Sequence, residues 1–172
     1  MKKFFTILLV SIMVFGFMLE QTNVIVAAKT PTFSTKVTAA KKFVTLEKVL
    51  VNAKWQQVEY DQEGKNLRFF AFKKVNYYGG LSTAVAVLRS QKIGGYYIDV
   101  TIANPRDKDV LEVAKRSLQL AGVPVSAKTF WAVVNKAKST GHAQLVRWGR
   151  YEFRVTPVDG GLYITETEHN HF

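Results

Sequence analysis

The chain lacks cysteine altogether and contains only four prolines in 172 residues. Without cysteine there is no disulfide, no thiol nucleophile and no cysteine-linked lipid anchor, so a folded domain must be stabilised by burial alone. This absence is typical of proteins exported by bacteria that make few disulfides. We therefore expect a Gram-positive envelope or medium, with an oxidising periplasm as the alternative.

Several catalytic motifs are also absent. The sequence contains no HExxH, no GxSxG, no Ser-x-x-Lys and no glycine-rich phosphate loop. These absences exclude the common designs of secreted metalloproteases and serine hydrolases, and the lack of thiol excludes cysteine proteases. No cofactor is expected.

The first 28 residues have the three parts of a secretory signal peptide. Lys2 and Lys3 precede an apolar run over 4–19, and small residues at 26–28 suit a signal peptidase. We predict cleavage after Ala28, which would leave no transmembrane segment. The alternative is an uncleaved anchor, although a run of 16 residues is shorter than the roughly 20 that span a bilayer. Either way, the sequence predicts a secreted or cell-wall-associated protein.

Positive charge dominates what remains. The whole chain carries +11, and loss of residues 1–28 would leave +10. The last 18 residues, 155–172, contain no Lys or Arg. A field of this sign attracts anionic partners, which outside a cell are wall phosphate polymers, lipid headgroups or nucleic acid. The alternative is that the lysines serve only solubility.

Glycine, proline and Asn/Asp positions divide the mature part into segments. We expect a flexible leader over 29–38 and a single domain over 39–172, without internal repeats. Apolar spacing favours a helix over 39–53. Asn104-Pro105, with the carboxylates of Asp107 and Asp109, marks the start of a second helix that Gly122 closes, and Ser126 and Gly141 mark the limits of a third. Segments with strand character are the following: 55–60, 67–75, 83–89, 96–103, 143–148, 150–156 and 162–167. The grouping predicts an α+β fold with two to three helices and a mainly antiparallel sheet of about five to six strands.

Three groups of residues are candidates for function. If 148–154 is one strand, Trp148, Arg150, Glu152 and Arg154 share a face. A carboxylate between two arginines could serve a nuclease, with Glu152 as base and His142 as acid. The alternative is ordinary charge pairing across strands.

The second group is the tail, where His169 and His171 could hold a zinc or copper ion weakly. The third combines aromatic and basic residues at Lys73, Lys74, Tyr77 and Tyr78. Tyrosine stacking beside lysine charge suits sugars, bases and phosphates.

These features lead to one main expectation and two alternatives. We expect a non-enzymatic exported protein that binds an anionic envelope polymer or another secreted protein through a basic, aromatic surface comprising Lys73, Lys74, Tyr77, Tyr78, Trp148, Arg150 and Arg154. The alternatives are a small secreted nuclease and a secreted inhibitor or immunity protein.

Overall fold

The computed structural model describes residues 30–74, 83–92, 95–148 and 151–168. The chain divides into two compact units, residues 1–30 and 31–172, and the second contains all the described elements. In chain order these are α2 (Phe33–Ala39), α3 (Phe43–Asn52), β1 (Gln57–Glu63), β2 (Asn66–Lys74), β3 (Thr83–Lys92), β4 (Gly95–Ala103), α4 (Lys108–Leu120), α5 (Ala127–Thr140), β5 (Gln144–Trp148), β6 (Tyr151–Val158) and β7 (Gly161–Glu168).

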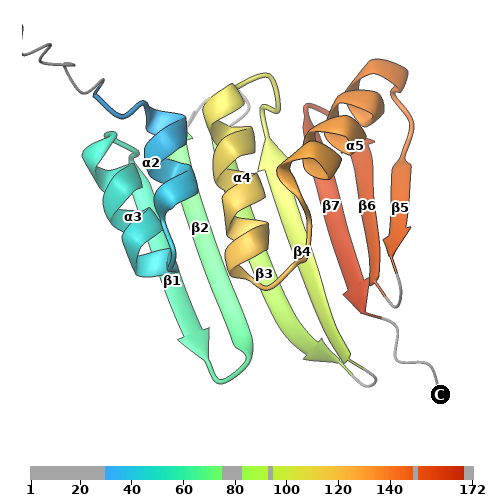
Figure 1. Ribbon diagram of the computed structural model, residues 1–172, viewed down its shortest axis with the longest axis horizontal. Coiled ribbons are helices and arrows are strands. Elements are labelled where there is room, and N and C mark those ends of the chain that lie inside the picture. Colours follow the sequence, from blue (N-terminus) through green and yellow to red (C-terminus); the bar gives the residue numbers. More distant parts are fainter. Residues whose placement is uncertain (1–29, 75–82, 93–94, 149–150, 169–172) are drawn as a thin grey trace, which may run out of the picture. The chain divides into compact units, whose positions relative to one another are not determined.

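The strands form one seven-stranded sheet in the order β1-β2-β3-β4-β7-β6-β5, and every neighbouring pair is antiparallel (Figure 1). Strands β1 to β4 make one meander and β5 to β7 make another. The two meanders join where β4 pairs with β7, so that Val100 lies between Val87 and Ile164. A pair of helices precedes each meander, which gives the two halves a similar order of elements.

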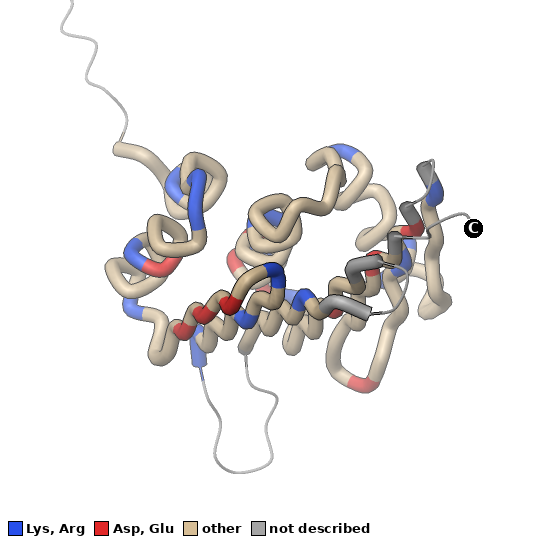
Figure 2. The backbone as a smooth tube through the Cα atoms, turned by 90° about the horizontal axis from the view of Figure 1, so that it is seen from below, with Lys and Arg blue, Asp and Glu red and all other residues tan. Residues whose placement is uncertain are grey.

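All four helices lie on the same face of the sheet (Figure 2). Helix α3 contacts β1, α4 contacts β3 and β4, and α5 contacts β5 and β6. Buried residues alternate with accessible ones along the strands because successive side chains point to opposite faces. In β4, Ile98, Val100 and Ile102 are buried, as the alternating pattern predicts.

The core fills the space between the helices and this face of the sheet. Phe69, Phe130 and Phe153 are fully buried there. Phe43 of α3 packs against Phe69 with ring centroids 5.1 Å apart, and Phe130 of α5 lies 6.4 Å from Phe153. Helices α3 and α5 are thus fixed to the strands beneath them by large apolar side chains, which are the strongest source of burial energy.

The cap geometry confirms the predicted limits of α5, whereas α4 has its N-cap at Asp107, three residues after the expected start at Asn104-Pro105. The Asp107 carboxylate accepts from the Asp109 backbone N–H at 2.9 Å, and Ser126 Oγ accepts from the Thr129 N–H at 3.0 Å. Gly141 closes α5 in the left-handed region at φ 67°. These local hydrogen bonds satisfy helix-end groups that would otherwise need water.

The α+β class and the antiparallel sheet are confirmed, but the expected numbers of helices and strands were too low. The described residues form four helices and seven strands. The segment expected as a flexible leader contains α2, whose Val37 is completely buried. Polar composition concealed this helix, because a seven-residue helix is held by packing rather than by its own propensity.

Candidate binding site on the open sheet face

The face of the sheet opposite the helices presents the alternate residues of each strand. On β2 and β3 these are aromatic and aliphatic, and on β4, β7 and β6 they are mostly polar or aromatic. The side chains described on this face are Gln57, Glu59, Asp61, Glu63, Arg68, Phe70, Phe72, Ala84, Ala86, Leu88, Tyr97, Asp99, Thr101, Tyr163, Thr165, Thr167, Glu152, Arg154, Thr156, Leu145 and Arg147. We call this set the open face.

One part of the open face is a hydrogen-bonded group of two tyrosines and an aspartate. The hydroxyl of Tyr163 on β7 donates to the Asp99 carboxylate on the neighbouring strand β4. Burial, the bond to Asp99 and the contact with Tyr97 raise the pKa of Tyr163 well above its usual value. Burial also raises the pKa of Tyr97. Both phenols therefore stay protonated at neutral pH and act as hydrogen-bonding groups rather than as bases.

A second part is a carboxylate between two guanidinium groups. Glu152 on β6 lies opposite Arg147 on β5, and its oxygens are 2.8 Å from Arg147 Nη2 and 3.1 Å from Arg154 Nη2. The hydrogen bond from Arg147 is the main reason that the pKa of Glu152 is lowered, and it outweighs the opposing effect of burial. A lowered pKa makes Glu152 a weak proton acceptor, which suits charge pairing better than general-base catalysis.

The two parts form one continuous network. Register places Asp99 opposite Thr165 and Thr165 opposite Arg154, so the three lie in one row across β4, β7 and β6. The charge of Arg154 also acts on Tyr97. The open face thus carries two carboxylates, two guanidinium groups and two phenols within a strip four strands wide.

Trp148 does not belong to the same strand as Glu152 and Arg154. The expectation that these three residues share one face of a single strand is therefore wrong. Strand β5 ends at Trp148, β6 begins at Tyr151, and these two residues pair with each other. The residue opposite Glu152 is Arg147, which the sequence did not single out. Arg150 lies outside the described residues.

His142 and Glu152 are not brought together. His142 is exposed and comes two residues before β5, whereas Glu152 pairs with Arg147, five positions further along. At ~3.4 Å per residue, their backbones lie ~17 Å apart. The acid and base of the nuclease alternative would need to approach one substrate atom, and the described geometry does not place them to do so.

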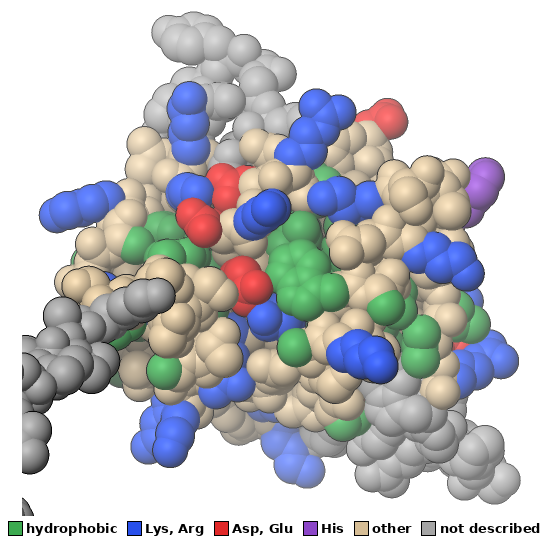
Figure 3. Space-filling model, turned by 45° about the horizontal axis from the view of Figure 1, so that its top comes forward, with side chains coloured by type: hydrophobic (Ala, Val, Ile, Leu, Met, Phe, Trp, Pro, Cys, Tyr) green, Lys and Arg blue, Asp and Glu red, His purple; other side chains and the backbone are tan. Residues whose placement is uncertain are grey.

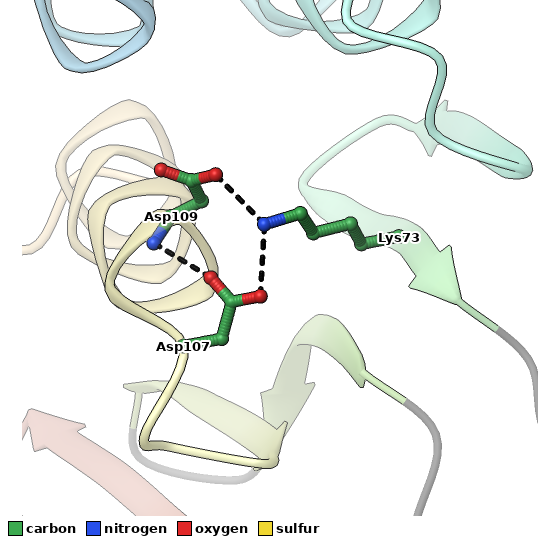
Figure 4. Close-up of polar contacts among 3 residues, drawn as sticks. All are labelled: Lys73, Asp107 and Asp109. Atoms are coloured by element: carbon green, nitrogen blue, oxygen red, sulfur yellow. Dashed lines mark hydrogen bonds and ion pairs between the residues drawn. The ribbon is translucent and has the colours of Figure 1, made fainter.

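Lys73 contacts α4 rather than the open face. The strand register shifts between Phe72 and Lys74, and Lys73 Nζ lies 2.8 Å from Asp107 Oδ2 and 2.7 Å from Asp109 Oδ2 (Figure 4). Burial lowers the pKa of Lys73, but the hydrogen bonds and charges of the two aspartates raise it more. This lysine therefore fastens the end of β2 to the first turn of α4.

The remaining predicted residues are dispersed. Lys74 is exposed at the end of β2, and β2 is four strand positions from the β6 strand of Arg154, which corresponds to ~19 Å. Tyr77, Tyr78, His169 and His171 lie outside the described residues. Binding by these residues stays a prediction.

The surrounding charge is divided between the two faces. The segments 33–54 and 106–140, which contain the helices, hold 12 Lys and Arg and only four Asp and Glu. Figure 3 shows Lys and Arg side chains distributed over this side of the molecule. On the open face, by contrast, five described carboxylates accompany three arginines. The excess positive charge is therefore a property of the helix side.

Within the described residues, no group of three or more His, Asp or Glu could hold a metal ion. None of the described helices is both long and apolar enough to cross a membrane.

The residues of the open face that the sequence missed are Tyr97, Asp99, Tyr163 and Arg147. Alternation in 96–103 and 162–167 does place the first three on the accessible side of their strands. Their proximity arises from the pairing of β4 with β7, which periodicity does not reveal.

Comparison of the chain with protein-family models, with curated proteins and with solved structures gives no match. The assignment of function therefore depends on the geometry of the two faces.

Proposed function

We propose that this chain is an exported, non-enzymatic binding protein that docks another secreted protein on its open face. The signal-peptide pattern of residues 1–28 supports export. The observation that carries the proposal is the one-sided packing of the sheet: within the described residues, helices cover one face and no element covers the other.

The open face has the size and composition of a protein interface. Six strand spacings of ~4.8 Å and about seven residues of ~3.4 Å give roughly 700 Å², close to the ~800 Å² that each partner buries in a standard complex. Leu88 is 40% exposed, and Phe70 and Phe72 lie half-buried on the neighbouring strand β2, opposite Ala86 and Ala84. Tyrosine and arginine, which often dominate binding energy, occupy the neighbouring strands.

The charges define the chemistry of the partner. Glu59, Asp61 and Glu63 are exposed along the β1 edge. Arg147 and Arg154 lie toward the opposite edge, where each already pairs with Glu152. The partner surface that complements this face is apolar at its centre and basic where it contacts β1. An inhibitor or immunity protein is one form of such a binding protein.

Site-specific photocrosslinking tests this proposal. A photoreactive side chain at Leu88 should give covalent adducts of defined mass with protein from the culture medium or envelope of the source organism. Val51 on α3 is the matched control, because it is also an exposed aliphatic residue at 55%. Adducts at position 88 and none at 51 support docking on the open face. Equal adducts at both positions, or adducts at position 51 alone, would contradict it.

A second candidate function is binding of an anionic envelope polymer, and the charge of the helix side favours it. Replacement of Lys41, Lys42 and Lys48 by Gln should weaken binding to washed envelopes and reduce the slope of log K against log salt by about two to three units. The matched control replaces Arg68, Arg147 and Arg154 by Gln, which removes equal charge from the open face. A larger effect of the control would contradict this assignment. If the envelope polymer stays intact during these binding measurements, the result argues against its hydrolysis by the protein.

A further inference from the structure

A cavity of about 360 Å³ lies away from the open-face network, at the end of the sheet where the β6–β7 turn meets the segment before α4 and the last turn of α5. Its walls combine apolar and cationic groups. Pro105, Pro157, Val158 and Leu162 supply the apolar part. No sequence motif points to this cavity, because its three segments are distant along the chain.

The cavity is built on fixed backbone. The Asn104 N–H donates to Gly160 O at 3.2 Å, which joins the segment before α4 to the β6–β7 turn. Lys138 Nζ donates to Pro105 O at 2.8 Å, which joins α5 to the same segment. Asn104 adopts φ 52°, in the left-handed region that asparagine enters more readily than most other non-glycine residues. The walls are therefore held in place before any ligand arrives.

The ionisable residues that line the cavity are both cationic. Of its nine described lining residues, the two ionisable ones are Arg106 and Lys138. Lys138 uses one of its three N–H donors on Pro105 O, and the Arg106 guanidinium is exposed with five donors in a planar fork. Two carboxylates adjoin lining residues in sequence. Asp107 is engaged by Lys73 and by the Asp109 N–H, and exposed Asp159 lies between Val158 and Gly160 in the β6–β7 turn.

The volume of the cavity is large enough for an anion with an organic part. A volume of about 360 Å³ corresponds to roughly twelve water molecules at ~30 Å³ each, which exceeds a bare phosphate ion. Two cations match the charge of a phosphate monoester, about −1.5 to −2 at neutral pH. The proline and aliphatic walls would contact the organic part of the ligand.

We propose that this cavity binds a small organic phosphate monoester, with Arg106 and Lys138 on the phosphate and Pro105 and Pro157 against its organic body. The site is separate from the open face, and its occupancy does not depend on the docking of a protein there.

Calorimetric titration of the purified protein tests the proposal, with glycerol 3-phosphate as the probe and inorganic phosphate and glycerol as comparison ligands. Glycerol 3-phosphate should bind at least about fivefold more tightly than either, because only it offers both charge and body. Arg106→Gln should weaken this binding about tenfold. Lys128→Gln is the matched control: it removes an exposed charge of α5 that does not line the cavity, and it should change affinity less than about twofold.

A second variant tests the contribution of the cavity's shape without changing its charge. Val158→Trp places a large side chain at a half-exposed lining position and leaves the net charge unchanged, so it should also weaken glycerol 3-phosphate binding. The proposal is overturned if the Arg106 and Lys128 variants lose affinity equally, if inorganic phosphate binds as well as the ester, or if no heat is seen at about 10 mM ligand.

Discussion

The two faces of the sheet are made from the same strands, yet they differ in both packing and charge. The helix side contains the fully buried aromatic core and is flanked by segments rich in lysine. The open face carries half-buried aromatic side chains and a balanced network of acids, arginines and phenols. Stability is thus concentrated on one face, and the open face is the surface on which we propose that a partner docks.

This difference determines which surface of the molecule carries the positive charge. Taken over the whole chain, +11 suggests that an anionic ligand binds wherever basic and aromatic residues meet. The structure distributes that charge mainly on the helix side, and on the open face the arginines on β5 and β6 are paired with Glu152. A polymer and a protein partner would therefore use different surfaces of the molecule.

Neighbouring phenylalanines on β2 give the strongest test of this comparison. Phe69 is fully buried against Phe43, whereas Phe70 faces the open side and is half-buried. Phe69→Ala should lower the free energy of unfolding by about 3–5 kcal/mol, because it leaves a cavity in the core. Phe70→Ala should cost less than about 2 kcal/mol. Urea unfolding of both variants checks the difference, and equal losses would mean that the open face is as well packed as the core.

A smaller effect is expected at the junction of β2 and α4. Lys73→Met removes the ammonium group that bridges Asp107 and Asp109, and it should lower the free energy of unfolding by about 1 kcal/mol, since Lys73 is 34% exposed and partly screened. The pKa of Lys73 is raised in the folded state, so its contribution is complete below the model-peptide value of 10.5 and is lost as the pH rises through the folded pKa.

Unfolding measured at pH 7 and above pH 10.5 checks this linkage. The wild-type protein should lose stability over this range by more than the Lys73→Met variant does. Exposed Lys74, the adjacent residue, is the control, and Lys74→Met should leave both values within about 0.5 kcal/mol of wild type. The same pH dependence in the Lys73 variant and in wild type would refute the assignment.

Local features of the fold could be predicted from the sequence, because they depend on nearby residues. Ser126 and Gly141 limit α5 as expected, and the alternation in 96–103 identifies the buried side of β4. Helix α2 could not be predicted in this way, since its only fully buried residue, Val37, is held by tertiary contacts. The end of β5 at Trp148 agrees with the predicted segment 143–148, but the alternation of 148–154 gave no sign that Trp148 pairs with Tyr151.

The candidate site depends on contacts between distant parts of the sequence. Asp99 and Tyr163 are 64 residues apart and meet only because β4 pairs with β7. The sequence did indicate that Glu152 lies beside Arg154, but it did not name Arg147, which the structure also pairs with Glu152; Arg150 lies outside the described residues. A hairpin brings residues of two strands side by side, and a pattern read along one strand cannot include its partner.

The smallest expected effect on the free energy of unfolding is that of replacing Glu152. Glu152→Gln keeps the shape of the side chain and removes its pairing with Arg147 and Arg154, which should lower the free energy of unfolding by about 0.5–1 kcal/mol at pH 7. The pKa of Glu152 is lowered in the folded state, so its contribution is present above the model-peptide value of 4.5 and is lost as the pH falls through the folded pKa.

The difference in the free energy of unfolding between wild type and the Glu152→Gln variant should therefore shrink below pH 4.5. It should also shrink at high salt, because both arginines are exposed. Urea unfolding at pH 7 and pH 3 measures the first change, and a difference that stayed constant would show that packing, rather than charge, fixes Glu152 on the open face.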